Sequence, residues 1–249
     1  MKLISVFLLI LTSMAWSQSV FDSSSTRSTK KRVGKIYNYV GPWKKNITST
    51  VFWIGEKPAG ANKTPNHKSS WDTNWAKNFG GFDDPDPKAR TGYRPKAFIP
   101  RQNPFYIALP YNDLRSYNRQ KPEAAEVIPW HKYYFVRPGR SICKGVWVQI
   151  IHDGKSCFAQ WEDCGPWNTD DYEYVFGDKQ TPKTSKNGAA GIDVSPAVRD
   201  FLGLQSGEKC HWRFVPFHRI PEGPWRLYGT NNPFRNKEMI PIVKNIPGK

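Results

Sequence analysis

Short apolar and aromatic stretches, separated by turn-forming residues, recur along the chain from residue 36 onward. Such stretches are rich in Val, Ile, Phe, Tyr and Trp and are bounded by Gly, Pro and Asn. β-Branched and aromatic residues suit a pleated, half-buried surface, and these boundaries are typical of short strands. The pattern predicts strands at 47–54, 104–109, 132–136, 146–152, 157–162 and 211–215.

Two segments carry helix signals instead. Residues 195–203 begin with Ser195 and Pro196 and end at Gly203, which are a capping residue, a first-turn proline and a terminating glycine. Residues 70–77, closed by a pair of glycines, show a shorter version. The chain has 21 prolines, which predict long loops and an irregular tail over 217–249. The expected class is mostly β, with a barrel favoured over an open sheet.

The first residues indicate export. Lys2 precedes an apolar run over 3–15, and the small residues Ala15 and Ser17 stand just before Gln18. The run is too short to span a bilayer, so residues 1–17 are predicted to be a signal peptide rather than an anchor or a core helix. No cysteine follows the run, which argues against a lipid anchor. The expected location is therefore secreted or periplasmic.

The rest of the chain divides into two parts. Residues 18–35 are basic, rich in Ser and Thr and nearly free of apolar residues, which is the composition of a flexible linker. Such a segment could also bind an anionic surface. Residues 36–249 show no internal repeat and suffice for a single domain with N-terminal and C-terminal extensions.

Four cysteines, Cys143, Cys157, Cys164 and Cys210, fit two disulfides in an oxidising compartment. The alternative is a four-thiolate zinc site, which the absence of a Cys-x-x-Cys pair disfavours. A two-residue turn at Gly154-Lys155 would place Cys143 near Cys164 and leave Cys157 for Cys210.

The net charge of +16, from 37 basic and 21 acidic residues, predicts anionic partners. In an exported protein these are wall polymers, acidic glycans or lipid headgroups rather than nucleic acid. The alternative is that the charge only maintains solubility. No integral membrane contact is expected, and we expect a monomer.

Two aspartates stand where sites are commonly built. Asp163 follows the predicted strand 157–162, directly before a Gly-Pro break, and loops at strand ends often carry function. Asp193 lies two residues before the helix cap Ser195. Asp193 could instead be structural, accepting backbone N–H groups at the start of that helix.

These motifs resemble those of the rare lipoprotein A family, whose double-psi β-barrel is shared with expansins and small endoglucanases. That family has an Asp-Arg-Gly-Pro segment, then Ile-Asp-Leu-Ser, then a short helix ending in Leu-Gly. The resemblance covers about 146–215, with 50–55 and 105–111 as the counterparts of its first strands, and implies a six-stranded double-psi β-barrel. It rests on Asp163-Cys164-Gly165-Pro166, Ile192-Asp193-Val194-Ser195-Pro196-Ala197 and Leu202-Gly203.

The chain also departs from this family. Cys164 stands in place of its Arg, residues 168–191 are inserted, and Ile107-Ala108 replaces its Ala-His. Its Ser-Gly-Glu has no clean counterpart, although Asp72 or Glu56 could substitute.

The resemblance implies catalytic roles for carboxylates. Asp163 resembles the aspartate of lytic peptidoglycan cleavage, and Asp193 resembles the general acid of the endoglucanase and expansin barrels. Asp113 is a third candidate, or else a turn residue bonded to backbone. Aromatic residues could stack on sugar rings or simply build the core. The candidates are Trp53, Trp71, Tyr111, Trp161 and Trp167.

No cofactor is expected, since neither a phosphate-binding glycine loop nor a serine nucleophile elbow is present. No metal site is expected either, because the five histidines are scattered. The expected function is binding of a wall glycan, peptidoglycan first, and its cleavage by lytic-transglycosylase-like or glycosidase-like chemistry. The alternatives are a non-catalytic, expansin-like carbohydrate-binding module and an exported barrel that serves as a scaffold for protein interactions.

Overall fold

The structure is a computed structural model that describes residues 38–60, 62–116 and 118–239. The predicted signal peptide 1–17, the predicted linker 18–35 and the end of the predicted tail, 240–249, lie outside the described residues.

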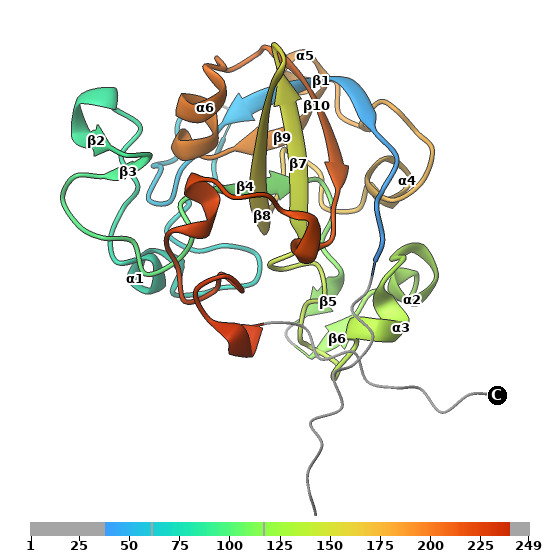
Figure 1. Cartoon of the computed structure of the whole chain (residues 1–249). Helices are drawn as coiled ribbons and strands as arrows, with labels where there is room; N and C mark the ends of the chain where they lie inside the picture. The colour runs from blue at the N-terminus through green and yellow to red at the C-terminus, as the bar shows by residue number, and fades with distance from the viewer. Residues whose placement is uncertain (1–37, 61, 117, 240–249) are drawn as a thin grey trace, which may run out of the picture. The chain divides into compact units, whose positions relative to one another are not determined.

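Six strands form a closed barrel in the order β1-β10-β7-β8-β4-β9 (Figure 1). Strands β4 and β8 pair in parallel, as do β1 and β9, and the other four pairs are antiparallel. Closure pairs every barrel strand on both sides, which removes exposed edges. The expected mostly-β class is confirmed. The strands are β1 Lys44–Val51, β4 Tyr106–Leu109, β7 Trp147–His152, β8 Lys155–Cys164, β9 Ala190–Val194 and β10 Lys209–Phe214.

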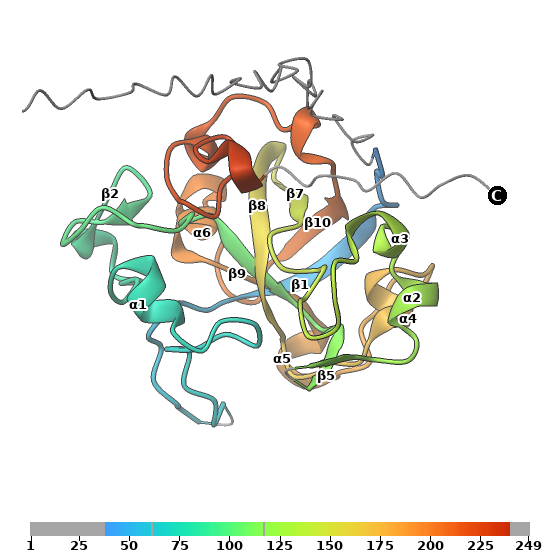
Figure 2. The same cartoon turned by 90° about the horizontal axis from the view of Figure 1, so that it is seen from below.

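Short helices and two small hairpins surround the barrel. Figures 1 and 2 place α1 with β2 and β3 on one side of it and α2, α3 and α4 on the opposite side. The small sheets pair β2 Arg90–Thr91 with β3 Arg94–Pro95, and β5 Leu114–Ser116 with β6 Arg119–Gln120. The helices are α1 Trp75–Phe79, α2 Ala124–Val127, α3 His131–Tyr134, α4 Tyr172–Val175, α5 Lys186–Ala189 and α6 Pro196–Leu202. Single 3₁₀ turns are η1 Pro87–Ala89, η2 Phe217–Arg219, η3 Pro224–Arg226 and η4 Lys237–Met239. No described helix is long and apolar enough to cross a bilayer.

Five of the six predicted strands overlap barrel strands, and the sixth is wrong. Residues 131–134 form α3 instead of a strand. Trp130, directly before α3, is 1% exposed and donates from Nε1 to the carbonyl of Ile142 at 2.7 Å. This tertiary anchor outweighs the strand propensity of the aromatic run that follows. The sequence interpretation also missed β9, whose five residues run directly into the helix signal at Ser195.

The hairpin between β7 and β8 turns one residue earlier than predicted. His152 pairs with Lys155, so the two turn residues are Asp153 and Gly154. Both have positive φ, 44° and 76°, as a tight hairpin with the twist of its strands requires. An Asp-Gly pair adopts these angles readily, whereas Lys does not.

Helix α6 forms as predicted and is tied to the barrel at its first residue. Ser195 Oγ accepts from Val198 N at 3.3 Å, which caps the helix, and donates to Pro104 O at 2.8 Å. Its backbone N–H donates to Tyr106 O at 3.0 Å. The junction between β9 and α6 is thereby fixed against β4, and the position of Asp193 with it.

Asp83, the first residue of the acidic run 83–86, is held in the interior by ionic and hydrogen-bonding partners. Asp83 is 1% exposed, forms an ion pair with Arg90 and accepts from the hydroxyl of Tyr106 at 2.9 Å. Arg90 also binds Asp200, at the end of α6, at 2.9 Å. A buried charge needs such partners to offset its lost hydration.

Candidate functional site

Asp163 and Asp193 lie on either side of one residue of the barrel. Ala108 of β4 pairs with Asp163 of β8 and with Asp193 of β9. Adjacent strands are about 4.8 Å apart, so the two aspartate Cα atoms are separated by roughly 10 Å. The sequence motifs 30 positions apart are therefore brought to one place by β4, the strand between them.

Asp163 is only 8% exposed, and backbone groups hold its carboxyl. Its Oδ1 accepts from Ser70 N at 2.7 Å and from Cys164 N at 2.8 Å. Burial raises the pKa of Asp163 to about 6, although these hydrogen bonds act in the opposite direction. The first bond also fixes the 69–72 segment across the end of β8.

Asp193 is half-buried and faces a neighbouring strand and a glycine. Thr50, its partner residue on β1, donates a hydrogen bond from Oγ1 to Asp193 Oδ1. A Cβ atom at Gly165 would stand 3.2 Å from Asp193 Oδ2, and Gly165 has a φ of +149°. Position 165 therefore requires glycine, both for its backbone conformation and for its close approach to the Asp193 carboxyl.

The pKa of Asp193 is raised to about 7, chiefly by burial. The hydrogen bond from Thr50 opposes this shift, whereas the negative charges of Glu56 and Asp163 add to it. Glu56 is itself half-buried, accepts from Asn66 Nδ2 at 2.7 Å, and has a raised pKa, also because of burial. Of the two substitutes considered for the missing Ser-Gly-Glu motif, Glu56 is the one whose charge acts on Asp193.

A second group of charges adjoins Asp163 and was missed from the sequence. Lys144 Nζ lies 3.4 Å from Asp72 and 3.8 Å from Glu162. Burial raises the pKa of Glu162. For Asp72 burial acts in the same direction, but hydrogen bonds, chiefly from Asn78, and the charge of Lys144 outweigh it and lower the pKa. Nothing in a lone Lys within a turn, or in a lone Glu within a strand, signals such a cluster.

Asp113 lies in the interior, away from the surface of the fold. It is fully buried, and its two carboxyl oxygens accept from Ser141 Oγ at 2.7 Å and Ile142 N at 2.8 Å. Both carboxyl oxygens of Asp113 anchor residues 141–142, and a catalytic role for Asp113 stays a prediction. The alternative of bonding to backbone describes it better.

The five candidate aromatic residues separate into two groups. Tyr111 and Trp161 are fully buried and belong to the main hydrophobic core, which matches the alternative that aromatic residues build the core. Trp53, Trp71 and Trp167 are half-buried. Trp71 packs edge-on against Trp161 at 5.4 Å and donates to Asn112 Oδ1 at 2.8 Å, while Lys186 lies 4.4 Å above the ring of Trp167.

All four cysteines are free thiols in the structure. The predicted bridge between Cys157 and Cys210 is opposed by the strand order. Cys157 of β8 pairs with Ile150 of β7, which separates it from Cys210 of β10. Two strand spacings are roughly 10 Å, more than the 7 Å or so that a disulfide spans between Cα atoms. The predicted bridge between Cys143 and Cys164 is likewise absent. Burial raises the pKa of Cys143, and the charges of Asp113 and then of Cys164 add to this shift.

The described residues hold no group of three or more His, Cys, Asp or Glu side chains that could bind a metal ion. The chemistry available at the site is that of two carboxyl groups whose pKa values, about 7 for Asp193 and about 6 for Asp163, lie near neutral pH. Comparison of the chain with models of protein families, with curated proteins and with solved structures found no match.

Proposed function

We propose that the chain is a secreted double-psi β-barrel protein, similar to the rare lipoprotein A and expansin families, that cleaves a cell-wall glycan. The order of the motifs around Asp163 and Asp193, and a closed six-stranded barrel with two parallel strand pairs, support this proposal. The chain departs from these families in its insertion at 168–191 and in having Ile107-Ala108 in place of Ala-His. Its substrate could therefore be a different cell-wall glycan from theirs.

One observation carries the enzymatic proposal: two carboxyls with pKa values of about 6 and about 7 flank Ala108. At neutral pH Asp193 retains a proton in about half of the molecules while Asp163 is mostly ionised. A carboxylic acid near its pKa can protonate the leaving glycosidic oxygen, and an ionised neighbour can stabilise the oxocarbenium-like centre. In a lytic reaction a hydroxyl of the sugar replaces water as the nucleophile, and Asp193 takes up its proton again.

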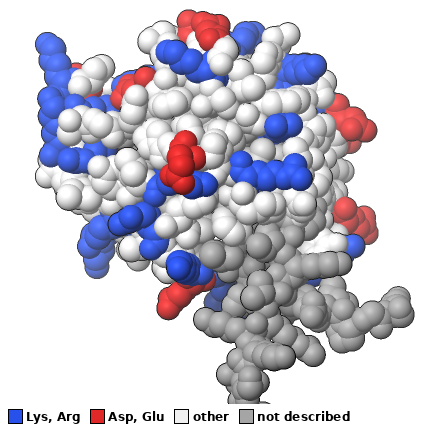
Figure 3. Space-filling view, in the orientation of Figure 1, with Lys and Arg blue, Asp and Glu red and all other residues white. Residues whose placement is uncertain are grey.

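The partner proposed is an anionic polysaccharide of the wall, peptidoglycan first. Figure 3 shows basic side chains in several groups over the visible face, with fewer acidic ones. A positive surface raises the local concentration of such a polymer. The half-buried Trp53, Trp71 and Trp167 are the residues of the predicted aromatic set that lie partly at the surface and could stack on sugar rings.

The test is incubation of the chain from residue 18 onward with peptidoglycan sacculi and with cellulose. Soluble products are identified by mass spectrometry, and bound protein is measured by cosedimentation. We expect anhydro-sugar fragments from sacculi, and we expect Asp193→Asn to reduce their rate of formation by about 10² to 10⁴, the usual contribution of a general acid. Asp163→Asn should also reduce it.

Asp153→Asn is the matched control, because the Asp153 side chain is 86% exposed in the β7–β8 turn and lies outside the carboxyl pair. It should cleave at the wild-type rate. Cleavage that persists unchanged in Asp193→Asn would overturn the assignment of the acid.

A non-catalytic carbohydrate-binding module is the second candidate, and the environment of Asp163 favours it. Two backbone N–H groups already hold Asp163 Oδ1 in a buried position, as expected of a residue that supports a loop. Binding to sacculi without any soluble product, unchanged in both aspartate variants, would establish this function instead.

A further inference from the structure

A mostly apolar cavity of about 460 Å³ is lined by neither of the paired aspartates nor by Glu56. Its volume is within the range of small-molecule sites. Residues from several segments far apart in the sequence line it, including Trp130, the start of β7, the end of β10 and Asn231. The cavity is therefore a product of the fold and not of one loop.

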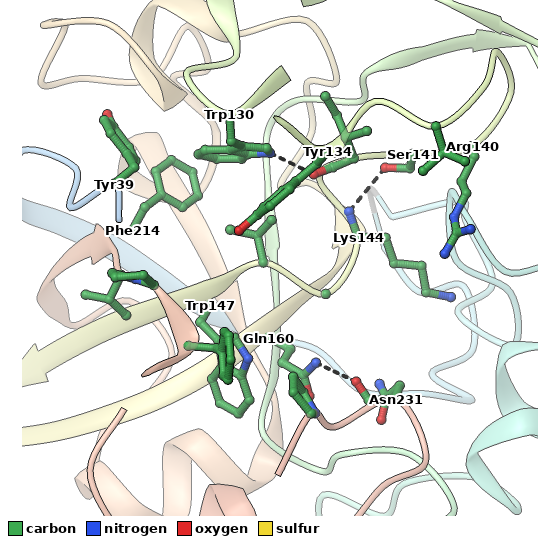
Figure 4. A pocket seen from close by; sticks show the side chains of 18 of the residues that line it. Tyr39, Trp130, Tyr134, Arg140, Ser141, Lys144, Trp147, Gln160, Phe214 and Asn231 are labelled. Atoms are coloured by element: carbon green, nitrogen blue, oxygen red, sulfur yellow. Dashed lines mark hydrogen bonds between the residues drawn. The ribbon is translucent and has the colours of Figure 1, made fainter. Parts of the chain in front are cut away.

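The cavity has an aromatic side and a polar side. Figure 4 shows Trp130, Tyr134 and Phe214 on one side, with Lys144, Arg140 and Asn231 on the other. Trp130 and Phe214 are buried, and their rings are 4.9 Å apart in an edge-on contact. An occupant that matches this lining has an apolar body and a single polar end.

Trp147 supplies a hydrogen-bond donor without a partner. Its side chain lines the cavity and is 3% exposed, and Nε1 is buried without a hydrogen bond among the described residues. Buried indole N–H groups are normally bonded, because an unpaired one has lost its hydration without gaining a partner. In Figure 4 this nitrogen is on the side of the ring toward Gln160.

The other polar groups nearby are already engaged. Gln160 accepts from Asn103 Nδ2 at 2.8 Å and donates to Asn231 O at 2.9 Å. Ser141 Oγ donates to Asp113, and Lys144 pairs with Asp72 and Glu162. Trp147 Nε1 is therefore the buried donor in the described cavity lining that still lacks an acceptor atom.

The charges at the cavity favour a negative acceptor. Arg140 is exposed, and no ion pair forms between it and a described residue. Glu238, also exposed, is the acidic residue of the lining, and Lys144 adds a second positive charge that its two carboxylates offset. A guanidinium matches a carboxylate in geometry as well as in charge.

We infer that this cavity is a binding site for an amphipathic carboxylate, whose apolar body packs on the aromatic side and whose oxygen accepts from Trp147 Nε1. Arg140 attracts the carboxylate from the cavity's exposed margin. The inference does not depend on the proposed glycan cleavage.

The test uses the chain from residue 18 to Lys249 with dodecanoate, dodecanol and dodecylammonium as probes, each below its micelle concentration. Calorimetry measures affinity, and ¹⁵N-labelled tryptophan reports on indole N–H groups by NMR. We expect saturable binding in the order dodecanoate, dodecanol, dodecylammonium, with a shift of the Trp147 resonance. Trp147→Phe should weaken dodecanoate about tenfold, as expected for loss of a hydrogen bond to a charged group.

Arg140→Gln should lower the affinity for dodecanoate and leave that for dodecanol unchanged. The controls are Trp43→Phe, on a partly exposed tryptophan outside the lining, and Arg115→Gln, on an exposed arginine outside it. Neither should alter binding.

Absence of saturable binding by all three probes would overturn the inference, as would binding that Trp147→Phe leaves intact. A chain shortened to end at Met239 is also compared with the full chain. If only the shortened chain binds dodecanoate, residues 240–249 occupy the cavity in the full chain, and the inference of a carboxylate site is overturned. Cleavage of sacculi is measured separately, so failure here leaves the proposed function untouched.

Discussion

Burial affects the two protonation states of Asp193 unequally. The ionised carboxyl loses far more hydration than the neutral one, and the charges of Glu56 and Asp163 disfavour it further. The folded chain therefore keeps a proton at pH values where the unfolded chain has lost it. The resulting contribution to stability is fully present below about pH 4 and is lost as the pH rises through about 7.

We predict that the free energy of unfolding falls between pH 5 and pH 8 and that Asp193→Asn reduces this fall. The change attributable to Asp193 is on the order of 1 to 3 kcal/mol. Urea unfolding at intervals of one pH unit measures it. Asp163, with a pKa of about 6, contributes in the same direction at lower pH.

Asp153→Asn serves again as the control and should keep the wild-type slope. An Asp193→Asn variant with an undiminished slope would show that Asp193 is ionised in the folded chain at pH 7, which would also remove it as a general acid.

At the scale of elements, the junction of β9 and α6 sets the position of Asp193. The Ser195 hydroxyl bonds both to the helix, at Val198 N, and to the chain before β4, at Pro104 O. One side chain thus caps a helix and connects two elements that are 91 residues apart. Loss of the hydroxyl leaves a helix N–H and a buried carbonyl without a partner.

We predict that Ser195→Ala lowers the free energy of unfolding by about 2 kcal/mol, which combines a lost cap with an unpaired buried carbonyl. Denaturant unfolding measures the change. Ser206→Ala, at an exposed position, should change stability by less than about 0.5 kcal/mol. Equal effects in the two variants would contradict the role assigned to Ser195.

At the scale of the whole molecule, charge acts over longer distances than any single contact. The net charge of +16 is the balance of 37 basic and 21 acidic residues. On the face that Figure 3 shows, the basic side chains of the described residues lie in several groups rather than in one patch. One such group in this view lies at the side of the molecule where Figure 1 places β2 and β3. A distributed positive surface favours an extended polyanion over a compact anionic ligand.

We predict that binding to sacculi carrying anionic polymers weakens by about tenfold or more between 50 and 500 mM NaCl, because salt screens exposed charges. Cosedimentation at a series of salt concentrations measures this. Cellulose, which is neutral, is the control substrate and should bind with little dependence on salt. Salt-independent binding to sacculi would mean that the basic surface serves solubility alone.

Local chemistry explains which elements could be predicted from the sequence. Short apolar and aromatic stretches bounded by turn residues identified five of the barrel strands, and the Ser-Pro start and glycine end identified α6. The turn at Asp153-Gly154 was predicted one residue too late, because its register is set by the pairing of β7 with β8. Residues 131–134 were predicted to be a strand, but the anchoring of the preceding Trp130 favours a helix there.

The sequence by itself determined the mostly-β class, the capped helix and the two aspartate motifs, because each depends on neighbouring residues. Only the tertiary structure brought Asp163 and Asp193 to either side of Ala108 and added Glu56 beside them. It also placed Asp113 and Tyr111 in the interior and assembled the cavity around Trp147. Burial and the resulting pKa values depend on which strands pair, and that pairing is set by long-range closure of the barrel rather than by local sequence.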